Sequence, residues 1–308
     1  MYWNGFGVNC GKTTGPAHEL RLFGVTLDEP FHICEQISSA LAETSDPANG
    51  HTGRGVNEAF GNKAQLNVKS AQRVLDILQF YSTSRRPATL SGLAEALAMP
   101  KSSCLAILNT LVSNGYIYQV HSNLGYYPTR RWLDAATIIT ANDPVILRIG
   151  RQLIQLRDET EETVILGRAA GTRIMYIEVV ESLRTIRYTA HVGQFKPLHG
   201  TASGKALLGS LNEAERRALI SQLDLVALTP RTITNAEILC LDVAAGRARG
   251  WYVTVGENEP DTTAVAAPAR VAEEIYIVIV AGTTQRLEGR LEEIGRRLQA
   301  TCRAIEAS

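Results

Sequence analysis

The feature that most constrains this fold is a proline between two short segments of helical periodicity. Before Pro100, apolar residues follow the i, i+3, i+4, i+7 spacing of one helical face, at Leu90, Leu93, Ala94 and Leu97. After Pro100 the same spacing returns, at Cys104, Ile107, Leu108 and Leu111. Proline cannot continue a helix, but its fixed φ suits the first turn of a new one. The pattern predicts two helices joined by a tight turn, with Thr89 as N-cap of the first and Asn114-Gly115 ending the second.

The flanking residues extend this pair of helices into a larger motif. A third amphipathic helix is expected from Lys69 to about Ser82, with its apolar face at Ala71, Val74, Leu75 and Leu78. After Gly115 the pattern changes to two short β-type runs at 116–120 and 126–128, separated by turn residues. Helix, helix-turn-helix and β-hairpin in this order predict a winged helix-turn-helix.

The charge distribution indicates what this region binds. The whole chain has 31 basic and 31 acidic residues and is neutral. Residues 66–131 nevertheless carry seven basic side chains against two acidic ones, whereas residues 1–65 and 132–308 are both net acidic. A basic island in an otherwise acidic protein favours contact with a polyanion. The alternative is a basic surface on a helical module that binds another protein.

The outward face of the second helix would enter the major groove of DNA. On such a face asparagine pairs with adenine, small apolar side chains touch thymine methyl groups, and serines reach phosphates or base edges. Lysines and arginines around the motif neutralise phosphates. The candidate DNA-binding residues are Lys69, Arg73, Arg85, Arg86, Thr89, Lys101, Ser102, Ser103, Leu105, Ala106 and Asn109. The hairpin around Asn123 would lie against the DNA backbone, and the alternative is a polar face that is merely solvated.

The second half of the chain alternates helical and β-type segments. Two connecting helices are expected at 132–140 and 144–157. Runs rich in β-branched residues predict strands at 163–168, 173–180, 185–191, 251–255, 263–271 and 275–281. Helices are expected from 201, from 212, at 235–249 and at 286–305. Short connections between strands favour a mostly antiparallel sheet, so this is an α+β domain.

The first 65 residues have a different composition. They are rich in Gly, Asn and Thr and predict a poorly ordered extension, an expression tag or a mis-annotated leader, with one short helix at 31–42. Residues 7–13 superficially match a phosphate-binding loop. The first glycine of that motif would fall at position 6, which is Phe6, and no apolar strand leads into the loop, so nucleotide binding is rejected.

Composition also excludes several classes of protein. The sequence has no run of about 18 apolar residues to span a membrane and no signal-peptide pattern, so a cytoplasmic location is expected. The five cysteines are far apart without CxxC spacing, which predicts reduced structural thiols. The six histidines show no metal-ligand spacing, and we expect neither a metal nor a cofactor.

Four motifs in a fixed order resemble the signatures of the IclR family of bacterial transcriptional regulators, over about residues 66–305. They are Val68–Leu78, the Leu97–Ser103 turn, Pro197-Leu198-His199 with Thr201–Ala206, and Thr229–Thr234. The resemblance implies a winged-helix DNA-binding domain at 66–131, a helical linker at 132–158 and a GAF-like effector-binding domain at 159–308, assembled as dimers or dimers of dimers. The chain departs from the family at Leu105-Ala106, where His-Arg is common, at Asp261, which replaces a glycine, and at the end of the final strand, Ile279–Gly282.

The resemblance also implies where an effector binds. Carried over residue by residue, the effector pocket is lined by Tyr188, Ala202, Ser203, Thr254, Glu257, Ala264, Ile279 and Ala281. Residues 197–206 form a loop that enters a helix, and the unblocked N–H groups of a helix N-terminus bind anions. A carboxylate or an aromatic acid would suit this position. The alternative role of Ser203 is simply to cap its helix.

The leading hypothesis is therefore a transcriptional regulator whose binding to operator DNA is switched by a small-molecule effector. A second hypothesis keeps the sensor domain but has the winged helix bind a protein partner. An enzyme is a weak third, because His199, Cys240 and Ser203 form no recognisable triad and Ser203 lacks the glycine of a nucleophile elbow. His199 is expected to fix its loop by a hydrogen bond.

Overall fold

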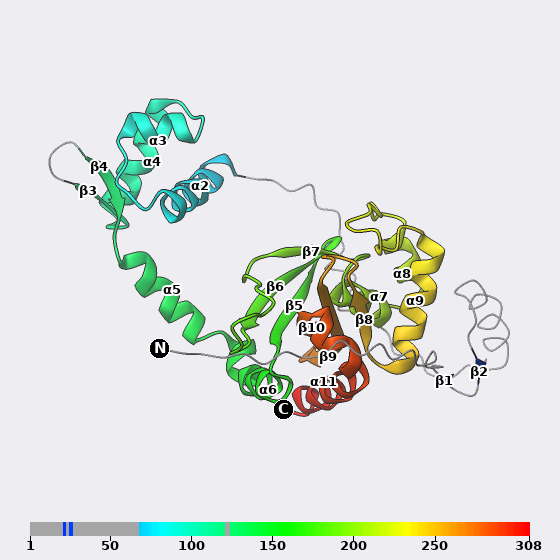
Figure 1. Cartoon of the computed structure of the whole chain (residues 1–308). Coiled ribbons are helices and arrows are strands. Elements are labelled where there is room, and N and C mark those ends of the chain that lie inside the picture. The colour runs from blue at the N-terminus through cyan, green and yellow to red at the C-terminus, as the bar shows by residue number, and fades with distance from the viewer. Residues whose placement is uncertain (1–20, 23–24, 27–67, 121–123) are drawn as a thin grey trace, which may run out of the picture. The chain divides into compact units, whose positions relative to one another are not determined.

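The computed structural model describes residues 21–22, 25–26, 68–120 and 124–308 (Figure 1). Near the N-terminus it describes one antiparallel pair of short strands, β1 (Arg21–Leu22) and β2 (Val25–Thr26). The helix expected at 31–42 and the loop at 7–13 lie outside the described residues, as does Asn123.

The winged helix-turn-helix expected from the sequence is present. Its elements are α2 (Lys69–Ser84), α3 (Leu90–Ala96), α4 (Lys101–Ser113), β3 (Ile117–Val120) and β4 (Gly125–Pro128). Thr89 caps α3, because its side chain accepts a hydrogen bond from the Gly92 N–H at 3.1 Å. Pro100 precedes the first helical residue of α4, and β3 pairs with β4 as an antiparallel hairpin.

The buried face of α2 differs from the expected one. Leu75 is 59% exposed, whereas Ile77 is fully buried and Tyr81 nearly so, in one cluster with Leu93, Cys104 and Leu108 of the next two helices. The Tyr81 hydroxyl also donates to the Tyr126 carbonyl at 2.9 Å. Val74 packs against the same cluster. The helix packs residues 74, 77 and 81 into the core, because the large aromatic side chain of Tyr81 reaches the hairpin and Leu75 does not.

Two helices follow the hairpin, α5 (Arg131–Ala141) and α6 (Pro144–Thr160). The indole N–H of Trp132, at the start of α5, donates to the Tyr116 carbonyl at 3.0 Å, and the two rings are 4.5 Å apart. Asp143 caps α6 by accepting hydrogen bonds from the Val145 and Ile146 N–H groups. The expected helical linker is therefore formed by two separately started helices.

The second half of the chain contains a six-stranded antiparallel sheet in the order β7-β6-β5-β10-β9-β8. The strands are β5 (Thr163–Ala170), β6 (Arg173–Val180), β7 (Phe195–Pro197), β8 (Tyr252–Val255), β9 (Thr262–Val271) and β10 (Glu274–Thr283). The predicted α+β class with an antiparallel sheet is confirmed.

The strand predicted at 185–191 is wrong. This segment is irregular, and the short strand β7 forms the sheet edge instead. β-Branched residues favour strands when they pack on a half-buried pleated surface, but Ile186 is 72% exposed. The Tyr188 carbonyl accepts a hydrogen bond from the Thr163 hydroxyl at 2.7 Å rather than from a strand neighbour.

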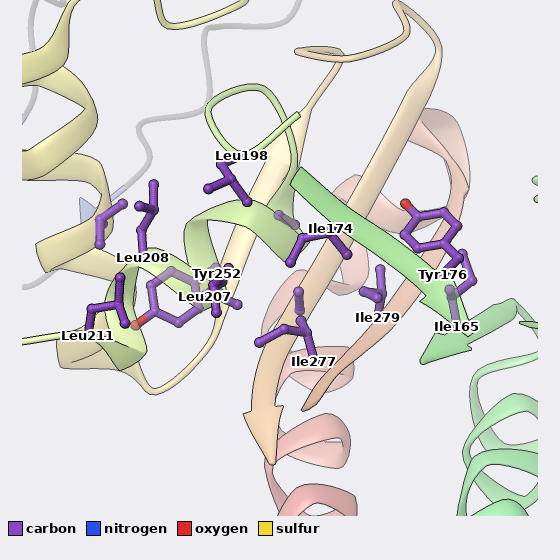
Figure 2. Packing of buried hydrophobic residues seen from close by; sticks show 14 of the residues in the cluster. Ile165, Ile174, Tyr176, Leu198, Leu207, Leu208, Leu211, Tyr252, Ile277 and Ile279 are labelled. Carbon is purple, nitrogen blue, oxygen red and sulfur yellow. The ribbon is translucent and has the colours of Figure 1, made fainter. Parts of the chain in front are cut away.

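Helices cover the two faces of the sheet, because side chains alternate along each strand. On one face, Ile277 and Ile279 pack with residues of α7 (Ala202–Ser210), α8 (Glu213–Ile220) and α9 (Ala236–Arg249) (Figure 2). On the other face, Val278 and Val280 pack with α6, α10 (Thr284–Leu287) and α11 (Leu291–Glu306). The central strand β10 is therefore buried on both faces.

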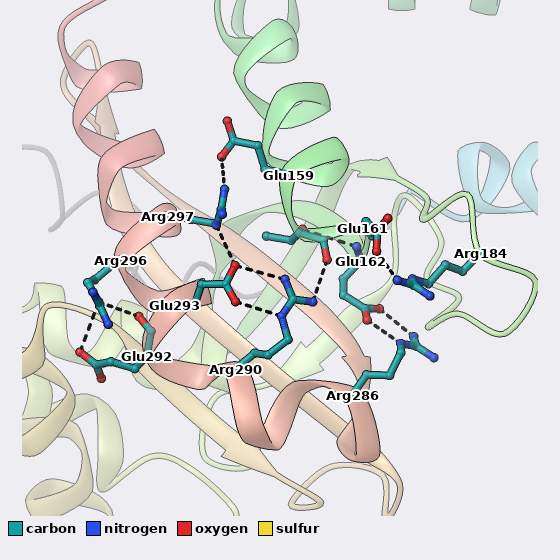
Figure 3. Close-up of polar contacts among 11 residues, drawn as sticks. Glu159, Glu161, Glu162, Arg184, Arg286, Arg290, Glu292, Glu293, Arg296 and Arg297 are labelled. Carbon is teal, nitrogen blue, oxygen red and sulfur yellow. Dashed lines mark hydrogen bonds and ion pairs between the residues drawn. The ribbon is translucent and has the colours of Figure 1, made fainter.

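Ion pairs fasten the end of α6 to the C-terminal helices (Figure 3). The Arg286 guanidinium donates to both carboxylate oxygens of Glu162, at 2.6 and 2.7 Å, and the Glu162 side chain is only 1% exposed. Arg297 lies 3.2 Å from Glu159, and Arg290 reaches the Thr160 carbonyl at 3.4 Å. These contacts hold the last turn of α6 against the domain that carries the sheet.

Candidate functional site

The structure places the predicted base-reading residues of α4 on one outward face. Cys104 and Leu108 are fully buried beneath the helix, while Leu105 is 38% exposed. The other outward residues are also exposed, and they are Lys101, Ser102, Ser103, Ala106 and Asn109. The helix therefore presents two serines, an asparagine and two small or apolar side chains to solvent, with a lysine at its N-terminal end.

The predicted phosphate contacts divide into two groups. Lys69, Arg85 and Arg86 are exposed. Arg73 is half-buried, and its guanidinium donates to the Leu97 carbonyl at 2.6 Å, so it ties α2 to the turn between α3 and α4. Thr89 uses its side-chain oxygen as a helix cap. Arg73 and Thr89 thus have structural roles. The sequence predicted the role of Thr89 as a cap but not the contact of Arg73.

A small cavity lies at the N-terminus of α7. Of the eight residues expected to line an effector pocket, seven line this cavity, namely Tyr188, Ala202, Ser203, Thr254, Ala264, Ile279 and Ala281. Tyr176, Thr201, Asn258 and Thr262 also line it and were not expected. The alternation along β6 places Tyr176 on the same face as the buried Ile174, which was the available signal for this residue. The cavity volume is about 20 Å³, close to that of a single water.

Thr201, and not Ser203, caps α7. The Thr201 hydroxyl accepts from the Gly204 N–H at 3.1 Å and donates to the Pro197 carbonyl at 2.6 Å. The Ser203 hydroxyl donates to Thr201 at 3.2 Å, and Ser203 is 1% exposed. A Cβ at Gly204 would lie 2.1 Å from the Leu198 carbonyl oxygen, so only glycine fits. The alternative reading of Ser203 as a helix cap is therefore wrong.

Three titratable side chains surround one side of the cavity. Burial raises the pKa of Tyr176, and the neighbouring Tyr188 raises it further, against an opposing hydrogen bond with Ser203. Burial lowers the pKa of Lys196, but its interactions with Tyr188 and Glu259 outweigh burial, and the net shift is upward. The phenol of Tyr176 thus stays neutral, and the ammonium of Lys196 stays charged, near neutral pH. Sequence reasoning did not identify Lys196.

Glu257 is the one expected pocket residue that does not line the cavity. Its carboxylate accepts two hydrogen bonds from Lys205, at 2.7 and 2.8 Å, and Lys205 also lies 2.8 Å from Asp242. Lys205 is 1% exposed. Burial raises the pKa of Glu257 in spite of the opposing lysine. This carboxylate is bound by Lys205 beside the cavity and does not form part of its lining.

The Thr229–Thr234 motif holds the segment that contains Glu257. The Thr229 hydroxyl donates to the Gly256 carbonyl and the Thr232 hydroxyl to the Glu257 carbonyl, both at 2.6 Å. Gly256 has a φ of +67°, a conformation that favours glycine. Residues 256–257 are therefore fixed by hydroxyl groups from a separate loop.

His199, one of the residues considered for catalysis, makes a structural contact. His199 is 3% exposed, and its ring nitrogen lies 2.9 Å from the Val226 carbonyl oxygen, which confirms the expected loop-fixing hydrogen bond. Within the described part of the chain, no group of three His, Cys, Asp or Glu residues is arranged to hold a metal ion. In the same part, no single helix is long and apolar enough to cross a bilayer, although α3 and α4 together meet the length and composition limits with a bend of 115°.

Comparison with known proteins follows the same division of the chain. Residues 138–307 match the family of bacterial transcriptional regulator IclR C-terminal domains, and residues 70–121 match the IclR helix-turn-helix domain. The probable transcriptional regulator SauR of Cupriavidus necator is 34% identical over 200 residues, covering 65% of this chain and 79% of that protein. The transcriptional regulator KdgR of Escherichia coli is 27% identical over 252 residues, covering 80% of this chain and 94% of that protein.

Solved structures share the fold. A putative transcriptional regulator from Rhodococcus sp. RHA1 superposes with a TM-score of 0.66 at 26% identity, over 78% of this chain and 98% of that one. IclR of Thermotoga maritima gives 0.67 at 24% identity over the same shares. An IclR homologue from Microbacterium hydrocarbonoxydans in complex with 4-hydroxybenzoate gives 0.63 at 20% identity, over 77% and 98% of the two chains.

Proposed function

Because the chain belongs to the IclR family of bacterial transcriptional regulators, we propose that α4 binds operator DNA and that a small acid in the cavity at α7 switches this binding. The chain is a regulator with a helix-turn-helix and an effector-binding domain. The observation that carries the finer proposal is the cavity, which brings seven of the eight expected effector residues together. In this proposal residues 66–131 form the DNA-binding domain, residues 159–308 form the effector-binding domain, and residues 132–158 link the two.

The exposed face of α4 supports direct reading of the major groove. Asn109 would pair with adenine, and Leu105 and Ala106 would contact thymine methyl groups. Lys69, Lys101 and the exposed arginines 85 and 86 would neutralise phosphates and set the orientation of the helix. The exposed face of α4 has no arginine, which makes the commonest contact with guanine, so we expect half-sites rich in A·T pairs.

The composition of the cavity supports a carboxylate or an aromatic acid as effector. Tyrosine rings and aliphatic side chains supply apolar contact, and the N-terminus of α7 favours negative charge. A homologue with the same fold is complexed with 4-hydroxybenzoate. The cavity has a volume of only about 20 Å³. An effector as large as 4-hydroxybenzoate therefore binds only if a wall of the cavity moves. A ligand that requires one of two wall positions shifts the population between them.

Hydrogen bonds connect the cavity wall to the linker. Thr163 holds the carbonyl of Tyr188 at 2.7 Å and also accepts the Ser182 N–H at 3.2 Å. The Ser182 hydroxyl donates to the Glu161 carbonyl, at the end of α6, at 2.6 Å. Arg157 of α6 donates to the Glu181 carbonyl at 3.0 Å. We infer that a displacement of Tyr188 by ligand reaches α6 through these contacts.

The linker also supports a homo-oligomer. None of the residues of α5, all of which the structure describes, is buried. Leu133, Ile138 and Ile139 are 55, 66 and 71% exposed. A second copy of the chain would cover these side chains in a dimer, and two dimers would form a tetramer.

The competing reading has the winged helix bind a protein. Its support is the same uncharged face, in which Leu105 is 38% exposed. The two readings differ in their dependence on salt. If a dimer makes about three phosphate contacts per subunit, log K for promoter DNA should fall with log salt at a slope of roughly −5. Electrophoretic mobility shifts at several salt concentrations measure this slope, and a slope near zero excludes DNA binding by cation–phosphate contact.

A further inference from the structure

One buried cation beside the cavity has no part in the expected effector site. Lys196 lies on β7 directly opposite Ile174 of β6, so its side chain is on the same face of the sheet as Ile174 and Tyr176. The Lys196 side chain is 9% exposed. Its Nζ is 5.9 Å from the centre of the Tyr188 ring, which lines the cavity. A buried ammonium next to a binding cavity requires a counter-ion.

The counter-ion comes from the loop of residues 256–261, which contributes to the lining of the cavity. Glu259 Oε1 lies 3.2 Å from Lys196 Nζ, and the same oxygen accepts a hydrogen bond from Asn258 Nδ2 at 3.1 Å. Asn258 is a cavity residue. The Glu259 side chain is 47% exposed, in contrast to the buried lysine that it neutralises. The ion pair is therefore asymmetric, with a fixed cation and a carboxylate already half in water.

This asymmetry decides which partner can be replaced. A half-exposed carboxylate returns to water at little cost, because much of it is already hydrated in the ion pair. A buried lysine left without any anion is strongly unfavourable. Lys205 shows the opposite arrangement, because its partners Glu257 and Asp242 have side chains 11 and 32% exposed and hold the cavity wall. Of these two buried lysines, Lys196 is the one whose anion can be exchanged.

We propose that Lys196 is the group that recognises a carboxylate effector, and that the effector's carboxylate replaces that of Glu259 on the lysine ammonium. This rests on the proposed function, since it names the ligand class of the same cavity. The exchange conserves one ion pair, so the buried charge stays neutralised throughout. It releases Glu259 and with it the loop that contains Asn258, which supplies the wall movement that a cavity of about 20 Å³ requires.

The test uses the full-length chain, acetate and benzoate as probes, and thermal unfolding followed by differential scanning calorimetry without DNA. Glu259→Gln removes the internal carboxylate and keeps the shape of the side chain. We expect 50 mM acetate or benzoate to raise the melting temperature of this variant by roughly 2–4 °C above the effect of 50 mM chloride, with a smaller rise in the wild type, where Glu259 competes.

Two further variants make the result specific. Glu259→Gln combined with Lys196→Gln should lose the carboxylate response, and Glu259→Gln combined with Lys196→Arg should keep it. Glu274→Gln removes another half-exposed glutamate, 3.2 Å from Arg168, and should respond as the wild type does. The proposal is overturned if Glu259→Gln responds no more than the wild type, or if the response survives Lys196→Gln. DNA binding is measured separately, so either result leaves the proposed regulator function to its own test.

Discussion

Lys205 and Lys196 lie on the same side of the sheet, and both are more than nine-tenths buried. The ammonium of Lys205 contacts two carboxylates from different elements, Glu257 after β8 and Asp242 in α9. That of Lys196 contacts the half-exposed Glu259. The first arrangement fixes a wall, and the second is the one in which we propose that a ligand carboxylate takes the place of the glutamate. In this proposal, two buried lysines acquire different roles because their partners differ in exposure.

Replacing Lys205 with methionine tests the structural role. Lys205→Met leaves the buried Glu257 carboxylate without its cation, and we expect a loss of about 3–5 kcal/mol in the free energy of unfolding. Urea denaturation measures this loss. Arg217→Met is the matched control, because it removes an ion pair with Glu213 in which both side chains are about two-thirds exposed. If Lys205→Met lowers the free energy of unfolding no more than the control does, then the ion pairs of Lys205 with Glu257 and Asp242 do not support the cavity wall.

At the scale of secondary structure, the elements with strong local signals were predictable. Thr89, Asn212 and Gly250 mark helix ends by capping geometry, and the structure has α3, α8 and α9 beginning or ending there. The hairpin of β3 and β4 also follows from the sequence, because Gly115 ends the preceding helix and Gly125 lies between the two β-type runs. Both glycines have positive φ in the structure. These signals are local, so a single sequence contains them.

What was missed depends on long-range packing. The buried face of α2 was misplaced at Leu75, since only the contact of Tyr81 with the hairpin decides it. The segment 185–191 has strand composition but no partner strand in the structure described. Lys196 was not identified, because its burial arises from pairing with β6 and from a loop more than 60 residues away. The cavity residues were expected from family resemblance and not from residue patterns.

The reading face of α4 gives a prediction about specificity. Asn109→Ala should weaken binding by about 1–3 kcal/mol at one base position and relax the preference there, because a bidentate contact to adenine is lost. Arg86→Ala should weaken all sequences alike, because phosphate contacts carry no base information. Selection of sites from random DNA with each variant measures both effects. Half-sites rich in G·C pairs from the wild type would show that the helix docks differently.

At the scale of the whole molecule, the exposed apolar residues of α5 predict self-association. A double replacement of Ile138 and Ile139 by glutamate should raise the dissociation constant of the oligomer at least tenfold, so that smaller species predominate. The reason is that burying two charges in the interface costs more than about 1.4 kcal/mol. Analytical ultracentrifugation measures the shift. Val226→Glu, at a residue 52% exposed outside the linker, is the control. An unchanged assembly in the double variant would place the interface elsewhere.

We propose that ligand binding at α7, in the effector-binding domain, controls DNA binding by the winged-helix domain. Ser203 is 1% exposed and lines the cavity, so Ser203→Trp fills the cavity. Ser210→Trp is the control, because it adds the same side chain at the far, half-exposed end of α7. The effector for the experiment is the acid that most raises the melting temperature of the wild type in a panel of carboxylates and aromatic acids.

The measurement is a titration of promoter DNA with and without this acid, for the wild type and both variants. Ser203→Trp should bind DNA with near-normal affinity and show no response to the acid, because coupling requires a ligand that distinguishes two states. Ser210→Trp should respond as the wild type does. A full response retained by Ser203→Trp would contradict the assignment of the cavity, and loss of DNA binding by a folded Ser203→Trp would show that Ser203 serves the assembly instead.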